Sequence, residues 1–298
     1  EGISHEDISI LLMNKLNRQF DGRLFMAIEI FNGTYPKRFL HELVSGQLDM
    51  DRMDYLNRDS FFTGVSEGVI SFDRIIKMLD VVGDHIAVEE KGIYSIEKFL
   101  IARRLMYWQV YLHKTVVSAE QLLAKILKRA RELALKDKRL FATPALNHFL
   151  SNTITKDDFM SSDAHVEIFT PIDDNDIMAA IKVWETCDDF ILSSLCRMLM
   201  RRHLYHIDIT NDVPDMALLE KLSEKAMGQY PIRQEELDYF VFTDTIKNNA
   251  YKPGDGSILI LMKDGKLQDI AQASDNSNLE ALARTVKKYI ICYTKELI

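Results

Sequence analysis

The chain has 298 residues, a formal net charge of −8 and a hydrophobic fraction of 47%. This composition is typical of a folded globular protein and excludes a disordered or collagenous chain. Proteins that coat nucleic acid polymers need a positive field, so the acidic balance argues against that class, although it leaves room for a small basic nucleotide pocket.

Three cysteines with no CxxC spacing indicate buried free thiols in a reducing cytoplasm. No stretch approaches the roughly 20 consecutive apolar residues that a membrane helix needs. We therefore expect a cytoplasmic protein with no membrane partner. The chain begins with Glu1 and continues as Gly2-Ile3-Ser4, which is typical of the interior of a protein, so we expect further residues upstream.

The first half of the chain is predicted to be almost entirely helical. Apolar residues near a 3.6-residue period predict a helix over 7–20, and Ser71 is expected to cap the helix that begins at Phe72. A small β-hairpin is predicted within residues 85–95, with its turn at 89–92. The absence of Gly and Pro from 95 to 135 predicts one long helix there. Shorter helices are expected at 24–31 and 36–45.

The second half is predicted to change from helix to mixed structure near Tyr230. Strands are expected in the remainder, with a turn at Asp264-Gly265, followed by a helix over 279–295. We expect a mainly α fold with two domains, a helical one over 1–228 and a small α/β appendage over 229–298. Helices are predicted at 144–150, 156–160, 175–186, 188–203 and 215–228, and strands at 237–243, 258–262 and 267–270.

A dense run of charged residues occupies positions 49–59. If this run is helical, Arg52, Tyr55 and Asp59 share one face, with Asp51 beside them. A solvated face with internal ion pairs is one interpretation. A binding site is the other, favoured because a solvated face rarely needs a tyrosine and because Asp is a poor helix former.

A second stripe lies on the predicted long helix, where Arg103, Tyr107, Tyr111 and Lys114 recur at helical spacing. The aromatic residues could pack in the core while the cations extend to solvent. Alternatively, the stripe could form an electropositive wall in which the cations meet phosphate oxygens and a tyrosine packs on a sugar or base.

These segments together resemble one known family. The string D-x-D-R-x-D-Y-x-x-R-D over 49–59, with GISHE at 2–6, FLHELVS at 39–45 and FLIAR at 99–103, is similar to the HD-domain phosphohydrolases. The closest branch is the deoxynucleoside triphosphate triphosphohydrolases. The resemblance covers residues 2–120 well and the remainder by layout, and it implies an HD-domain helical bundle.

The resemblance implies a divalent metal, with Mn, Mg, Fe, Ni and Zn as candidates, held by two histidines and two aspartates. Asp51 matches the last of these ligands. The others come from an H…HD pattern, and this sequence contains no His-Asp dipeptide. Either the missing ligands lie upstream or this homologue is degenerate, and the intact set of matching site residues favours the first explanation.

The resemblance also implies roles for six further residues. His5 matches a catalytic histidine near the scissile phosphate, although a lone histidine is most often structural. The others match substrate-binding residues: Arg52 and Arg103 on phosphate, Asp59 on the 3′-hydroxyl, Tyr55 where a 2′-hydroxyl would lie, and Tyr111 on the sugar.

In this family water attacks the α-phosphorus, which gives the deoxynucleoside and inorganic triphosphate. The implied partners are a deoxynucleotide substrate, an activating nucleotide and further copies of the chain in a homodimer or homotetramer. No nucleic acid polymer is required. Two alternatives stay open: a non-catalytic nucleotide-binding scaffold with an incomplete metal site, and an HD-type nucleotidase or phosphodiesterase.

Overall fold

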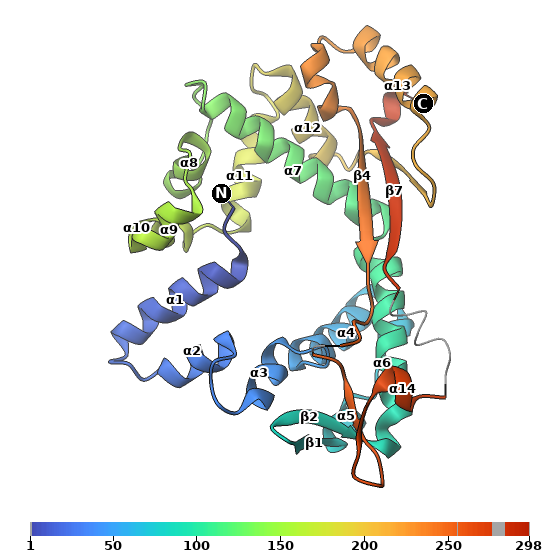
Figure 1. Cartoon of the computed structure of the whole chain (residues 1–298). Coiled ribbons are helices and arrows are strands. Elements are labelled where there is room, and N and C mark those ends of the chain that lie inside the picture. The colour runs from blue at the N-terminus through green and yellow to red at the C-terminus, as the bar shows by residue number, and fades with distance from the viewer. Residues whose placement is uncertain (1, 255, 276–283, 298) are drawn as a thin grey trace. The chain divides into compact units, whose positions relative to one another are not determined.

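The structure, a computed structural model, describes residues 2–254, 256–275 and 284–297 (Figure 1). The chain forms two compact units, each assembled from separate stretches of sequence. Unit 1 comprises 1–24, 114–245 and 289–298, and unit 2 comprises 25–113 and 246–288. The predicted division between residues 228 and 229 follows the chain instead, and it stays a prediction.

Unit 1 is mostly helical. Its first helix, α1 (His5–Gln19), begins with a capping box in which Ser4 and Asp7 bond reciprocally through side chain and backbone. Within this unit α7 packs against α12, and α1 packs against α10 (Figure 1). The remaining helices are α7 (Lys114–Ala134), α8 (Pro144–Ser151), α9 (Lys156–Ser161), α10 (Asp163–Phe169), α11 (Asp174–Trp184), α12 (Phe190–Met200) and α13 (Met216–Gln229).

A buried arginine joins three elements of unit 1. Arg129 on α7 donates to both carboxylate oxygens of Asp189, the residue that caps α12, at 3.0 and 2.6 Å. Its guanidinium also lies 3.2 Å from Glu236 in the 3-10 turn η4 (Gln234–Tyr239). Glu132 lies 3.4 Å away on the same helix. Because the Arg129 side chain is only 9% exposed, its charge depends on these three carboxylates for compensation.

The sheet with strand order β3-β7-β4 corrects two predictions. β3 (His206–Thr210) lies between the helices predicted at 188–203 and 215–228, within the domain expected to be helical, and it pairs antiparallel with β7 (Val286–Tyr293). β7 replaces most of the helix expected over 279–295, of which 279–283 lie outside the described residues. Its β-branched and aromatic residues favour a strand, and the buried run at its end lacks helical periodicity because both faces are covered. The third strand is β4 (Val241–Asn248). The 3-10 turn η5 (Lys295–Leu297) follows β7 near the end of the chain.

Unit 2 packs helices around one hydrophobic core and a small sheet. The core holds Leu56, Phe99, Leu100 and Met106, all inaccessible to solvent. Met53 is also buried. The helices are α2 (Phe25–Asn32), α3 (Arg38–Ser45), α4 (Met50–Thr63), α5 (Phe72–Lys77), α6 (Ile93–Met106) and α14 (Ile270–Ala273), with 3-10 turns η1 (Ser66–Gly68) and η2 (Glu90–Gly92).

The hairpin in unit 2 lies earlier than predicted. β1 (Leu79–Val82) pairs with β2 (His85–Glu89), and the turn is Gly83-Asp84 rather than 89–92. Both turn residues have positive φ, 55° and 70°, the backbone that a two-residue type I′ hairpin requires. The second predicted hairpin is confirmed: β5 (Leu259–Leu261) and β6 (Leu267–Asp269) pair around Asp264-Gly265 and extend the sheet in the order β1-β2-β5-β6.

The long helix predicted over 95–135 is interrupted. α6 ends at Met106, a π-helical turn runs from Tyr107 to Tyr111, and α7 begins at Lys114. The Leu112 amide donates to the Tyr107 carbonyl at 2.7 Å, a bond that spans five residues. The sequence carries no Gly or Pro to mark this break.

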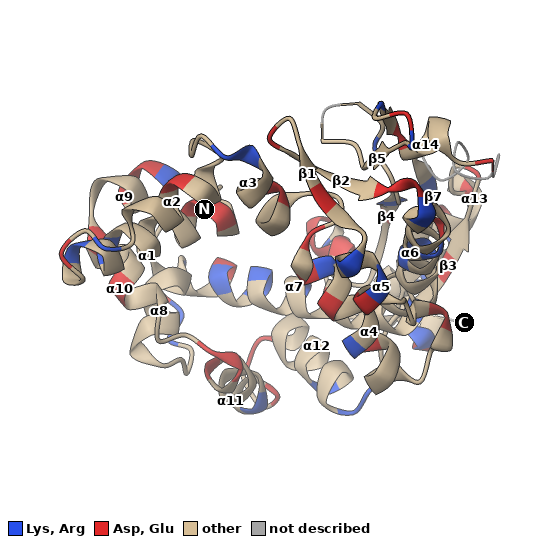
Figure 2. Cartoon of the chain, turned by 90° about the horizontal axis from the view of Figure 1, so that it is seen from below, with Lys and Arg blue, Asp and Glu red and all other residues tan. Residues whose placement is uncertain are grey.

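The mainly helical fold class with small sheets is confirmed. Lys and Arg are interspersed with Asp and Glu along the helices of both units (Figure 2). Within the described ranges, no helix is both long enough and apolar enough to cross a bilayer.

Candidate functional site

The site predicted on the charged run lies on α4 in unit 2. Asp49 caps this helix by accepting a hydrogen bond from the Arg52 amide at 2.8 Å. The Arg52 guanidinium returns to the same carboxylate and also donates to the Gly46 carbonyl at 2.6 Å. Burial raises the pKa of Asp49, and this effect outweighs the opposing attraction of Arg52. Arg52 is therefore held at the start of α4 by groups that the sequence analysis did not single out.

Tyrosines from α4 and the π-helical turn meet around Asp59. Tyr111 donates from its hydroxyl to the Asp59 carboxylate at 2.6 Å. Its ring meets those of Tyr55 and Tyr107 edge to face, with centroids 5.9 and 5.2 Å apart. Burial raises the pKa of Tyr55 to about 12, with Tyr107 adding to the shift. Burial and the bond to Asp59 also raise the pKa of Tyr111. Both phenols are therefore protonated at neutral pH.

The π-helical turn explains how the tyrosines converge. In a π turn the backbone bond spans five residues instead of four, and such turns occur frequently at functional sites. Here Tyr107 and Tyr111 occupy the two ends of the turn, and both contact other aromatic rings of the site. The predicted stripe on one continuous helix was therefore wrong in its geometry, but its two tyrosines do lie together.

Arg103 on α6 supplies a cation with an unused donor. α6 packs against α4, and the positive charge of Arg103 opposes the rise in the pKa of Tyr55. Its Nε is buried and has no hydrogen-bond partner among the described residues. A buried donor without an acceptor costs free energy, and a phosphate oxygen would satisfy it.

Asp51 is exposed on the first turn of α4. Three or more His, Cys, Asp or Glu side chains that could hold a metal do not gather anywhere in the described part of the chain. Asp51 alone therefore does not make a metal site, and the residues present do not fit the implied metal by themselves.

Two predicted residues belong to the other unit. His5 opens α1 with a 90% exposed side chain, and its Nε2 lies 3.0 Å from Glu6. Lys114 opens α7. Both lie in unit 1, whereas unit 2 brings together Arg52, Tyr55 and the other predicted contact residues, namely Asp59, Arg103 and Tyr111.

Sequence analysis missed parts of this site. Asp49 was recognised only as a member of the charged run, although Asp directly before a helix is a common cap. Tyr107 was placed on the stripe but given no role. The Gly46 carbonyl carries no side-chain signal and could not have been found from sequence.

Comparison with known proteins places the chain among phosphohydrolase-like structures. Residues 70–149 match the HD associated region. The chain is 49% identical to a phosphohydrolase crystal structure from Bacteroides thetaiotaomicron, with a TM-score of 0.93, and the match covers 99% of this chain and 73% of that one.

Two further relatives are similar to this chain in sequence. The protein YwfO of Bacillus subtilis is 31% identical over 280 residues, which cover 91% of this chain. The chain spans 61% of the length of YwfO. A Dictyostelium discoideum protein described as a deoxynucleoside triphosphate triphosphohydrolase SAMHD1 homolog is 30% identical over 138 residues, which are 42% of this chain and 27% of that protein.

Proposed function

The chain belongs to the family of HD-domain phosphohydrolases, and we propose that it hydrolyses deoxynucleoside triphosphates to the deoxynucleoside and inorganic triphosphate. The observation that carries this proposal is the buried, unpartnered Nε of Arg103 beside the Tyr55, Tyr111 and Asp59 cluster. The Arg103 guanidinium suits a phosphate, and the cluster of two tyrosines with Asp59 suits a sugar. A nucleotide combines a phosphate and a sugar in one molecule.

Arg103 and Arg52 bind the phosphates in this proposal. Arg52 is fixed by Asp49 and Gly46, so little side-chain freedom is lost when a phosphate arrives. The Arg103 Nε gains an acceptor that the described residues do not provide. Cations held in position stabilise the charge that develops on a transferred phosphoryl group.

The tyrosine cluster selects the sugar. Asp59 accepts from the 3′-hydroxyl, and its bond to Tyr111 holds the carboxylate in place for that contact. The Tyr55 ring occupies the position where a ribonucleotide would carry its 2′-hydroxyl, so a ribose would need to bury that hydroxyl against an aromatic face. An unpaired buried hydroxyl is costly, which favours the deoxyribonucleotide.

HD-domain phosphohydrolases generally use a divalent metal, which activates water and polarises a phosphoryl oxygen. We propose that Asp51 is one of its ligands and that the others come from outside these 298 residues. His5, at the start of α1, is proposed to protonate the leaving group or hold the scissile phosphate.

The decisive experiment uses the full-length protein, loaded with Mn²⁺ and incubated with each dNTP and each NTP. Chromatography should show deoxynucleoside and triphosphate in equal amounts. Asp51→Ala should abolish both metal content and turnover, whereas the control Asp54→Ala, on the exposed surface of the same helix, should keep both. Metal-loaded protein that binds nucleotide without turnover would indicate a scaffold. Release of inorganic phosphate from a nucleoside monophosphate would indicate a nucleotidase, and release of a nucleoside monophosphate from a phosphodiester would indicate a phosphodiesterase.

Assembly and location form part of the same proposal. We propose a homodimer or homotetramer regulated by an activating nucleotide. The support is a set of exposed apolar side chains on α4 and α5, including Phe61 and Phe62 at 80% and 78% exposure, because large exposed patches commonly mark interfaces. None of the three cysteines forms a disulfide, which fits a reducing cytoplasm. Light scattering with and without nucleotide tests the assembly.

A further inference from the structure

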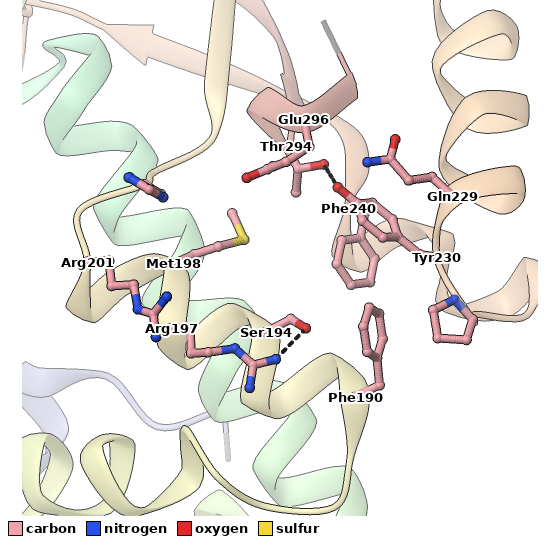
Figure 3. A pocket seen from close by; sticks show the side chains of 12 residues that line it. Phe190, Ser194, Arg197, Met198, Arg201, Gln229, Tyr230, Phe240, Thr294 and Glu296 are labelled. Carbon is pink, nitrogen blue, oxygen red and sulfur yellow. Dashed lines mark hydrogen bonds between the residues drawn. The ribbon is translucent and has the colours of Figure 1, made fainter.

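A cavity lies within unit 1, and none of the predicted site residues lines it. It has a volume of about 370 Å³. α12 forms one wall, and the segments around Tyr230, Phe240 and Thr294 form the other (Figure 3). No role was predicted for its lining residues.

The α12 wall is cationic. Arg197 donates only to neutral groups, the Glu185 carbonyl at 3.0 Å and the hydroxyls of Ser194 and Ser193 at 3.3 and 3.5 Å. Arg201, one turn further on, is exposed, and its guanidinium lies on the same side of the cavity (Figure 3). Neither arginine has a carboxylate within 4.0 Å among the described residues, so both positive charges remain available to an anion.

Three aromatic rings gather beside the cavity, Phe190 from the start of α12 and Tyr230 and Phe240 from the opposite wall. Phe240 is buried at its base, with the Tyr230 ring 4.7 Å away at 32° and the Phe190 ring 6.1 Å away at 27°. Phe190 and Tyr230 are partly exposed and line the cavity. Such rings offer a surface on which a planar aromatic ligand can stack.

A single carboxylate stands apart from the cations. Glu296 lies beside Thr294, whose hydroxyl bonds Tyr230 at 2.9 Å (Figure 3). Glu296 belongs to the wall opposite α12. The cavity therefore offers two positive groups at one end and an acceptor of hydrogen bonds at the other.

We propose that this cavity binds a small planar aromatic anion that carries an amino group. The ring stacks on Phe190 and Tyr230, the anionic group pairs with Arg197 and Arg201, and the amino group donates to Glu296. The volume is near the lower end of the roughly 300–1,000 Å³ usual for ligand pockets, which favours a ligand no larger than a nucleoside monophosphate. Two sources share this chemistry, a nucleoside monophosphate and an aminoaryl carboxylate.

The test is calorimetric titration of the full-length Arg103→Met variant, so that the proposed catalytic site does not contribute. The probes are adenosine monophosphate, 4-aminobenzoate and inorganic phosphate. We expect one of the aromatic probes to bind, and adding Arg201→Met to weaken that binding at least tenfold. The control Arg139→Met, which removes an exposed arginine outside the cavity, should leave it unchanged.

The two aromatic probes identify the source of the ligand, because each lacks the anionic group of the other. Phe190→Leu provides a second variant, which should weaken the aromatic probe by removing its stacking surface. The proposal is overturned if neither aromatic probe binds, if binding is unaffected by both Arg201→Met and Phe190→Leu, or if inorganic phosphate binds as tightly as adenosine monophosphate. Because binding is measured directly, loss of dNTP turnover would not affect the outcome.

Discussion

Replacing Arg103 by Met should have opposite effects on stability and on activity. The Nε of Arg103 is buried without an acceptor in the described structure, and leaving such a donor unsatisfied costs about 1–3 kcal/mol. Met has a similar length and no polar atom, so Arg103→Met removes this cost. The variant also loses the attraction between Arg103 and Asp49. We therefore expect the free energy of unfolding to rise by about 1 kcal/mol, the low end of the range.

Activity should fall in the same variant. A hydrogen bond to a charged group contributes about 1.5–3 kcal/mol, which corresponds to roughly a 10- to 150-fold change. We expect kcat/KM for dNTP hydrolysis to drop by about that factor. Lys98→Met is a matched control, because Lys98 is an exposed cation on the same helix, and it should change neither quantity much.

The two measurements are denaturant unfolding of the free protein and initial rates of triphosphate release, both with the full-length protein. The reasoning is refuted if Arg103→Met destabilises the fold by more than about 1 kcal/mol, since the Nε would then have been contributing to the core. It is equally refuted if kcat/KM stays within twofold of the parent while the protein remains folded.

Three other predictions concern single interactions. Tyr111→Phe removes the 2.6 Å bond to Asp59 and should reduce the preference for dNTPs over NTPs in competition assays; an unchanged preference would exclude a role in sugar selection. Arg129→Met leaves the Asp189 carboxylate without its cation, while Glu236 keeps Arg233, and should lower the free energy of unfolding by about 3–5 kcal/mol, which urea titration can check. Arg233 and, to a lesser extent, Arg129 hold the pKa of Glu236 at about 2. The stability that Glu236 contributes is therefore complete above about pH 4.5 and should be lost as pH falls toward 2. In the Glu236→Gln variant the free energy of unfolding should depend less on pH between about 4.5 and 2. An unaltered pH dependence would contradict the contribution ascribed to Glu236.

The sequence determined the helical elements wherever local signals agreed with one another. α1 follows the 3.6-residue apolar period that predicted a helix over 7–20, and it begins two residues earlier, at His5. α4 places Met53 and Leu56 inward, whereas Arg52, Tyr55 and Asp59 are only partly buried. The Asp264-Gly265 turn was predicted because Asp-Gly is a common hairpin signal, and Gly265 has a positive φ of 83° in a connection of three residues. The resemblance to the HD-domain phosphohydrolases rested on the same charged run, which is a local pattern.

Tertiary structure decided the elements for which local signals were weak or misleading. β7 was expected to be helical, and it is a strand because pairing with β3 satisfies its backbone while burial covers both faces. The π-helical turn at Tyr107–Tyr111 has no Gly or Pro to announce it. A turn of this kind is stabilised by contacts between segments far apart in the sequence, here those of Tyr111 with Asp59 and Tyr55.

The chemistry of the site divides in the same way. The shared helix face of Arg52, Tyr55 and Asp59 could be predicted from spacing, because one face of a helix repeats regularly, whereas their roles toward a nucleotide are what the family resemblance implies. The buried Arg103 Nε, the capture of Arg52 by Asp49 and the cavity beside α12 could not be predicted. Each depends on which atoms a second segment buries or leaves without a partner, and that is fixed only when the chain has folded.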